Sequence, residues 1–162
     1  MKSKKFVLGM LALALIFGLM VVGCPESGPE LDPLINGTWV NDTYGQAFEF
    51  TNGNFEVSMG NLLAQKGTYS TSGNNITMVT THVHGNFLNT IYEESEFNNA
   101  FYSRSEFIAL SMFDGRRETP DFLNFVDGIF GAQQATYSIS GNVLTITGTT
   151  PEGQSTTTFT KQ

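Results

Sequence analysis

Two histidines separated by a single valine, His82 and His84, are the polar side chains of this sequence whose spacing could support chemistry. They lie in a β-rich stretch, and side chains two residues apart on a strand point to the same face. Alternation from Ile76 and Met78 predicts that both histidines face inward, where they could share a metal ion such as zinc. No third ligand can be named from the sequence, so we expect no metal site. The alternative is that both histidines lie at a strand end near solvent and hydrogen-bond to loop backbone.

The sequence lacks the motifs of the common catalytic sites. It contains no glycine-rich phosphate loop and no Gly-x-Ser-x-Gly nucleophile elbow. Its single cysteine, Cys24, excludes an intramolecular disulfide. The formal net charge of −7 gives a surface that repels nucleic acid. We expect a protein that is not an enzyme, holds no cofactor and binds no nucleic acid.

Tight hairpins must position any site in this chain, because only 14% of its residues are charged while turn-forming and β-forming residues are abundant. Gly141-Asn142 separates two β-rich runs, and only residues that tolerate positive φ fit such a two-residue turn at low cost. Pairing outward from the turn places Ile139 opposite Leu144 and Tyr137 opposite Ile146. These four side chains share one face, and serine and threonine occupy the other, which predicts a sheet with one buried face.

Two earlier hairpins repeat this pattern. One turns at Gly73-Asn74 and places Tyr69, Ile76 and Met78 on its apolar face. The other turns at Asn52-Gly53, a strong hairpin signal, and its apolar face carries phenylalanine and valine at alternate positions. The predicted lining of a ligand cavity between these faces is Phe48, Phe50, Phe55, Val57, Tyr69, Ile76, Met78, His82, His84, Tyr137, Ile139, Leu144 and Ile146.

The hairpins, together with the terminal segments Gly37–Asp42 and Ser155–Lys161, make eight short strands. Tight turns between successive strands predict an antiparallel up-and-down meander. Pairing the first strand with the last would close the meander and leave no free sheet edge. We therefore predict an all-β, eight-stranded antiparallel barrel over residues 37–162.

The strand rhythm is broken at residues 85–133, which we predict to be a helical insertion between strands five and six. Ser103 followed by Glu106 is a capping-box pattern and predicts a short helix that runs to about Met112. Thr119-Pro120 combines an N-cap with proline at the first helical position, and it predicts the start of a second helix.

The second predicted helix is amphipathic. Its apolar residues are Phe122, Phe125, Val126 and Ile129, which follow the spacing of one helix face. Eight of the 14 phenylalanines lie in the insertion, and so much apolar surface is not left in water. We expect the insertion to cover one mouth of the barrel. Two arrangements stay open: a fixed plug that completes the core, or a lid formed by these four residues over a cavity.

The first residues resemble the signal peptide of a bacterial lipoprotein. Three lysines precede an almost purely apolar run, and Val21-Val22-Gly23-Cys24 resembles a relaxed lipobox. The resemblance implies removal of residues 1–23, a diacylglycerol thioether on Cys24, and acylation of its new amino group by a chain such as palmitate. Residues 24–36, which contain three prolines, would then form a flexible tether. The alternative is an uncleaved transmembrane anchor, because the apolar run reaches the lower limit for a span.

Gly37-x-Trp39 at the start of the first strand resembles the lipocalin signature. In that family the tryptophan closes one end of the barrel and a basic residue after the last strand packs on its ring. The resemblance implies these roles for Trp39 and Lys161. The repeated Tyr-Ser-x-Ser-Gly-Asn pattern is similar to lipocalin-like domains of bacterial lipoproteins, and this resemblance covers residues 37–162.

These observations lead to one expected function and one alternative. We expect a lipoprotein of the cell envelope, anchored by Cys24 in the outer membrane and facing the periplasm or the exterior, whose barrel binds or carries a small hydrophobic ligand. The alternative is an interaction module, in which a filled barrel is the rigid scaffold for contact with another protein.

Overall fold

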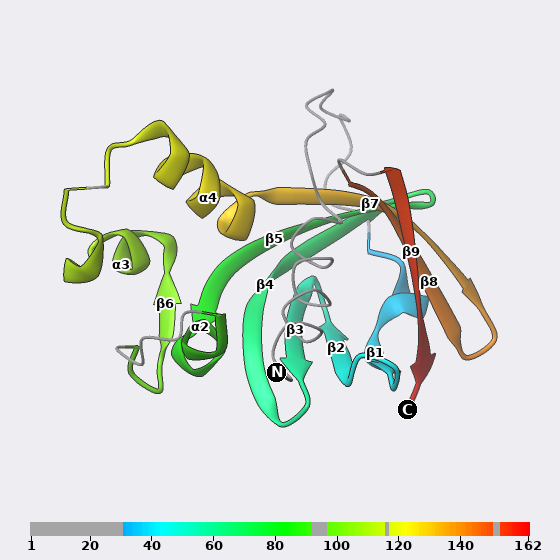
Figure 1. Ribbon diagram of the computed structural model, residues 1–162. Helices are drawn as coiled ribbons and strands as arrows, with labels where there is room; N and C mark the ends of the chain where they lie inside the picture. The colour runs from blue at the N-terminus through cyan, green and yellow to red at the C-terminus, as the bar shows by residue number, and fades with distance from the viewer. Residues whose placement is uncertain (1–30, 92–96, 116, 151–152) are drawn as a thin grey trace.

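The computed structural model describes residues 31–91, 97–115, 117–150 and 153–162. These residues form a β-barrel with a helical insertion on one side (Figure 1). The strands are β1 (Gly37–Asn41), β2 (Gln46–Thr51), β3 (Asn54–Met59), β4 (Leu62–Ser72), β5 (Asn75–His84), β6 (Phe101–Ser103), β7 (Ala132–Ser140), β8 (Val143–Thr150) and β9 (Gly153–Lys161). The helices are the 3-10 turns η1 (Pro33–Ile35) and η2 (Ser111–Phe113) and the α-helices α2 (Gly85–Ile91), α3 (Arg104–Ile108) and α4 (Pro120–Phe130).

Eight strands close into a ring of antiparallel pairs, which confirms the predicted up-and-down barrel. Strands β1 to β5 pair in sequence order, β5 pairs with β7, and β7, β8 and β9 follow. The ring closes where β9 pairs with β1, with Lys161 opposite Trp39. The short β6 pairs with the last part of β5 and lies outside the ring. Closure leaves neither β1 nor β9 as an open sheet edge.

Glycine and asparagine fix the tight turns as predicted. At the β2–β3 turn Asn52 has φ 48° and Gly53 has φ 83°, a conformation that matches the twist of the flanking strands. Phe50 then lies opposite Phe55. At the β7–β8 turn Gly141 has φ 60°, and the register of that hairpin is also the predicted one.

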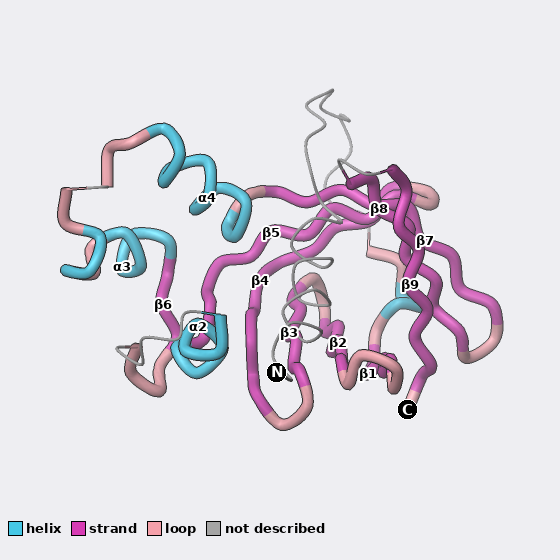
Figure 2. Tube along the Cα trace, in the orientation of Figure 1, coloured by secondary structure: helices cyan, strands magenta, loops and turns pink. Residues whose placement is uncertain are grey.

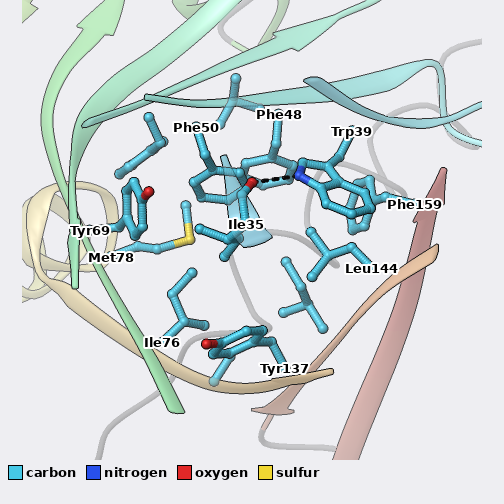
Figure 3. Close-up of a cluster of buried hydrophobic side chains, with 14 residues drawn as sticks. Ile35, Trp39, Phe48, Phe50, Tyr69, Ile76, Met78, Tyr137, Leu144 and Phe159 are labelled. Atoms are coloured by element: carbon cyan, nitrogen blue, oxygen red, sulfur yellow. Dashed lines mark hydrogen bonds between the residues drawn. The ribbon is translucent and has the colours of Figure 1, made fainter. Parts of the chain in front are cut away.

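The inner face of the ring carries a hydrophobic cluster that we call the barrel core (Figure 3). Buried and more exposed residues alternate along β2, as a strand with one buried face requires. The rings of Phe48 and Phe50 stack with centroids 5.6 Å apart, and Phe159 meets Phe48 edge-on at 5.2 Å. Both arrangements are favourable for aromatic pairs. The members of the barrel core are Ile35, Trp39, Phe48, Phe50, Phe55, Val57, Tyr69, Ile76, Met78, Ala135, Tyr137, Leu144, Ile146 and Phe159.

One end of the barrel, which we call the sealed end, is closed by the segment before β1. Ile35 at the end of η1 is fully buried in the barrel core. The Asp32 side chain caps η1 by accepting a hydrogen bond from the Leu34 N–H. The backbone N–H of Asp32 donates to Thr71 Oγ1 at 2.8 Å. This part of the tether predicted over residues 24–36 is therefore packed against the barrel, because a buried isoleucine and a capped helical turn hold it there.

The opposite end, where β5 ends and β7 begins, carries the insertion and is called the insertion end. The helices α2, α3 and α4, together with the short strand β6, lie to one side of the ring (Figure 2). Their phenylalanines form a second hydrophobic cluster, the insertion cluster, with side chains from the ends of β3, β4 and β5. Its buried members are Met59, Ala64, Val83, Phe87, Leu88, Phe97, Phe107, Phe113, Phe122, Val126 and Phe130.

The insertion contains the two predicted helix starts and two elements that were not predicted. Ser103 and Glu106 form the capping box of α3, and Thr119 caps α4. Helix α3 ends at Ile108, earlier than predicted, and η2 follows it. Helix α2 and strand β6 were not predicted, and β7 already begins at Ala132, so residues 132 and 133 belong to the barrel. Within the described ranges, no helix is long and apolar enough to cross a membrane.

Candidate functional site: the barrel interior

Most of the residues that were predicted to line a cavity lie on the inner face of the barrel. The residues that lie in the barrel core are Phe48, Phe50, Phe55, Val57, Tyr69, Ile76, Met78, Tyr137, Leu144 and Ile146. Ile139 is partly buried and packs against them. Period-two alternation places these side chains correctly because each hairpin has the predicted register next to its turn. The core residues Ile35, Ala135 and Phe159 were not predicted, although Ala135 and Phe159 follow the same alternation as their predicted neighbours.

Trp39 and Lys161 lie together at the sealed end, as the resemblance implied. The Trp39 ring is fully buried, its Nε1–H donates to Ile35 O at 2.7 Å (Figure 3), and Lys161 Nζ lies 5.0 Å from the ring centroid. Lys161 Nζ also donates to Leu34 O at 3.4 Å. Gly37 makes this packing feasible, because its φ is +121° and a Cβ there would lie 2.9 Å from Lys161 Cε. The positive φ is the main reason why this position of the Gly-x-Trp motif favours glycine, because the flexible end of the lysine side chain could move away from a Cβ.

A polar network links the segment before β1 to two tyrosines at the same end. The Tyr137 hydroxyl donates to Asp32 Oδ2 at 2.9 Å, and the Tyr69 hydroxyl donates to Asn36 Oδ1 at 3.0 Å. Burial, followed by the hydrogen bond to the Asp32 carboxylate and its negative charge, raises the pKa of Tyr137 to about 12. Burial also raises the pKa of Tyr69, against an opposing hydrogen bond with the Gly53 backbone. Both phenols stay protonated, and their hydrogen bonds to Asp32 and Asn36 hold the segment before β1 against the barrel.

Toward the insertion end the inner face becomes polar. Four buried residues, which we call the polar belt, lie on four strands: Asn41 on β1, Gln46 on β2, Thr80 on β5 and Gln133 on β7. Asn41 and Gln46 are register partners. The belt lies between the two hydrophobic clusters. Along β5, for example, Thr80 follows Met78 of the barrel core and precedes Val83 of the insertion cluster.

The belt contains the buried polar atoms of the barrel that lack partners. Both side-chain atoms of Gln46, Nε2 and Oε1, and the Oε1 of Gln133 have no hydrogen-bond partner among the described residues. These residues were not predicted from the sequence. Gln46 could have been found, because it is two residues before Phe48 and four before Phe50 on a strand whose alternate residues are buried.

The inward orientation predicted for His82 and His84 is wrong. In the β4–β5 register Gly67 pairs with Thr80 and Lys66 pairs with His82, so Thr81 is an extra residue on β5. Such a bulge reverses which side chains face inward beyond it. Val83 is therefore fully buried and the histidines face outward.

Both histidines lie beside Phe101 of β6 on the outer face. Their ring centroids are 6.4 Å (His82) and 4.9 Å (His84) from that of Phe101, and Lys66 Nζ lies 4.1 Å above the same ring. His84 Nδ1 accepts from the backbone N–H of Asn86 at 3.2 Å, as expected for a histidine at a strand end. In the part of the chain that the structure describes, no group of three or more histidine, cysteine, aspartate or glutamate residues is arranged to hold a metal ion.

The four predicted lid residues do not form one buried face. Phe122 and Val126 are buried in the insertion cluster and Ile129 packs against it, whereas Phe125 is 41% exposed. Phe130, which was not predicted, takes its place in the cluster. The insertion phenylalanines pack mainly on one another, as Phe107 does with Phe113 at 5.0 Å and with Phe130 at 5.8 Å between ring centroids. The insertion therefore has a small hydrophobic core, which joins the end of the barrel through side chains of β3, β4 and β5.

The predicted signal peptide, residues 1–23, and the lipidation site Cys24 lie outside the described residues. Comparisons of the chain with family models, with curated proteins and with solved structures found no match.

Proposed function

We propose that this protein is a lipid-anchored lipoprotein of the bacterial cell envelope and that its barrel binds a small hydrophobic ligand. The observation that carries the proposal is a closed ring of eight strands with an apolar inner face and one sealed end. Such a barrel takes up a molecule only from the insertion end, where the inner face is polar and the insertion cluster begins. A ring of eight strands has room for its own side chains or for one small ligand. The barrel resembles lipocalins in the Gly37-x-Trp39 motif and in the contact between Trp39 and Lys161.

The lipid anchor would hold the sealed end toward the membrane. Cys24 precedes Asp32 by eight residues, and a chain of that length spans at most about 28 Å. Because Asp32 is hydrogen-bonded to Thr71 and Tyr137 at the sealed end, a lipid on Cys24 would be attached within that distance of the sealed end. The insertion end then points away from the bilayer, toward the compartment from which a ligand would arrive.

The test is binding of a neutral fluorescent apolar probe, N-phenyl-1-naphthylamine, to the full-length protein in phosphatidylcholine nanodiscs. We expect saturable binding of one probe per chain, after subtraction of the signal from empty nanodiscs. Ala135 lies in the barrel core and Thr136 is exposed on the outer face of the same strand. Ala135→Leu should therefore weaken binding at least tenfold and Thr136→Leu should leave it unchanged. Absence of saturable binding by the wild-type protein would refute the carrier function.

A second candidate function, an interaction module, is favoured by Phe125. This aromatic side chain is exposed on α4 at the insertion end, while its neighbours Phe122 and Val126 are buried. A photo-crosslinking amino acid at position 125 should then capture a protein in intact envelopes. The same group at Asp121, which is exposed on the first turn of α4, is the control. Equal capture from both positions, or none, would leave this candidate without support.

A further inference from the structure

Gln46 carries a buried amide that no described residue satisfies. Its side chain is 1% exposed, and both Nε2 and Oε1 are unpaired. The register neighbour Asn41 is already occupied, because it donates to Thr158 O at 2.7 Å and accepts from the Tyr44 N–H at 3.0 Å. A buried amide without hydrogen-bond partners, such as that of Gln46, destabilises the fold unless another molecule binds it.

A further unpaired atom of the polar belt comes from another wall of the barrel. Gln133 Nε2 donates to Gly128 O in α4 at 2.9 Å, which fixes the amide and leaves Oε1 buried without a partner among the described residues. In the ring, two strands separate the β1–β2 pair from the β5–β7 pair on either side. Gln46 on β2 and Gln133 on β7 therefore lie on opposite walls of the ring, and both side chains are buried toward its insertion end.

The unpaired atoms define the chemistry of what would bind there. Gln46 offers an NH₂ donor and a carbonyl acceptor, and Gln133 offers a second carbonyl acceptor. The buried polar residues of the described chain are Asn41, Gln46, Thr71, Thr80 and Gln133, and none of them is charged. A carboxylate or phosphate would meet no charged side chain among the four belt residues, and burying an unpaired charge costs far more than burying a neutral polar group. The belt therefore favours an uncharged group that both donates and accepts hydrogen bonds.

We propose that the barrel selects an uncharged amphiphile, such as a long-chain primary amide or alcohol, and that Gln46 and Gln133 bind its head group. This inference rests on the proposed carrier function, which it makes more specific. The apolar chain of the ligand would lie against one of the two hydrophobic clusters that flank the belt. Charged amphiphiles of the same chain length should bind more weakly, because none of the four belt residues carries a charge.

The experiment compares two probes of equal chain length, octanamide and octanoate, at pH 8, where octanoate is ionised. Full-length protein in phosphatidylcholine nanodiscs is labelled with ¹⁵N-glutamine, and the side-chain NH₂ signals of Gln46 and Gln133 are followed by NMR. We expect octanamide to shift both pairs of signals saturably and to bind at least tenfold more tightly than octanoate. The signals of Gln134, which is exposed on the outer face of β7, should not move.

Variants locate the head group. Gln46→Met keeps the length of the side chain and removes its amide, so octanamide should bind at least tenfold more weakly while N-phenyl-1-naphthylamine binds as before. Gln134→Met is the matched control and should change neither affinity. The comparison of the two probes on the wild-type protein decides the matter even if Gln46→Met does not fold.

The outcomes separate this inference from the carrier function. If the apolar probe binds but octanamide does not shift the Gln46 signals, or if octanoate binds equally well, the head-group assignment is wrong and buried water satisfies the belt. If none of the three compounds binds, the carrier function fails as well.

Discussion

At the scale of single residues, the sealed end depends on a few side chains with exacting requirements. Gly37 adopts a positive φ that other residues rarely adopt, and Lys161 covers the space where a Cβ would be. Tyr137 reaches the Asp32 carboxylate, which fixes the chain before β1 to a strand more than a hundred positions away in sequence. Each of these contacts joins the two ends of the chain. We therefore expect substitutions here to affect the stability of the whole barrel.

The raised pKa of Tyr137 makes stability depend on pH in alkaline solution. Its pKa is about 12 in the folded protein and about 10 in an unfolded chain, so the folded state holds the proton more tightly. The stabilisation is complete below pH 10 and is lost as the pH rises toward 12, by at most about 1.4 kcal/mol per pH unit for this group. Urea unfolding between pH 9 and 12 should show this loss, and Tyr137→Phe should reduce its slope.

Tyr44, which is exposed, provides the control for that measurement. Tyr44→Phe should leave the alkaline slope unchanged. A slope in Tyr137→Phe equal to that of the wild-type protein would show that the phenol does not keep its proton in the fold. Part of the slope should remain in Tyr137→Phe, because the pKa of Tyr69 is raised as well.

Two glycine substitutions should have opposite effects on the free energy of unfolding. Gly37→Ala forces an alanine into a positive φ and against Lys161 Cε, and we expect it to destabilise the protein by about 1–3 kcal/mol. Gly128 lies inside α4, and a Cβ there would meet nothing within 4 Å. Gly128→Ala should therefore stabilise the protein by about 0.5–1 kcal/mol. Urea unfolding measures both, and equal effects of the two changes would contradict the argument.

At the scale of elements, the insertion is stabilised by packing among its own aromatic residues. Helix α3 has only five residues and α4 has eleven, and isolated helices of such length are marginal in water. What holds them is the insertion cluster, in which Phe107 is fully buried and lies within 6.5 Å of four other phenylalanine rings. The capping box at Ser103 and the cap at Thr119 then fix where the helices begin.

Removal of the Phe107 ring should therefore be far more costly than removal of the Phe125 ring. We expect Phe107→Ala to lower the free energy of unfolding by about 3–5 kcal/mol, because it leaves a cavity in the insertion cluster. Phe125→Ala removes a partly exposed ring and should cost less than about 1.5 kcal/mol. Urea unfolding followed by circular dichroism measures both variants. Similar losses would mean that the insertion does not have the core described for it.

At the scale of the whole molecule, the barrel depends on the pairing of its first and last strands. β9 pairs with β1 on one side and along nearly all of β8 on the other. The Gln162 N–H also donates to Thr38 O at 3.0 Å, beyond the last strand residue. Without β9 the ring would have two open edges, each able to pair with another chain.

A variant that lacks residues 153–162 should therefore aggregate or form oligomers. Light scattering after size-exclusion chromatography measures this change. Removal of Gln162 alone takes away one hydrogen bond to β1 and is the matched control, which should keep the size of the intact protein. A shortened chain that stays as small as the control would show that closure by β9 is not needed to protect the edges.

The sequence by itself determined the eight strands of the ring, the registers next to the three predicted turns, and the closure of the ring. Turn residues that tolerate positive φ fix where each hairpin reverses, and alternation then decides which side chains meet inside, from Phe50 and Phe55 to Tyr137 and Ile146. The helix starts at Ser103 and Thr119 were equally local, because a cap is made by residues three positions apart.

Only the tertiary structure decided what the ends of the barrel contain. Thr81, an extra residue in the register of β5 with β4, reverses the orientation of His82 and His84, and nothing in the composition of β5 marks the bulge. The polar belt forms because strands far apart in sequence close into one ring. Whether the amides of Gln46 and Gln133 find hydrogen-bond partners therefore depends on all the side chains around them. Local patterns specify strands and caps, whereas burial, bulges and unmet hydrogen bonds are properties of the assembled barrel.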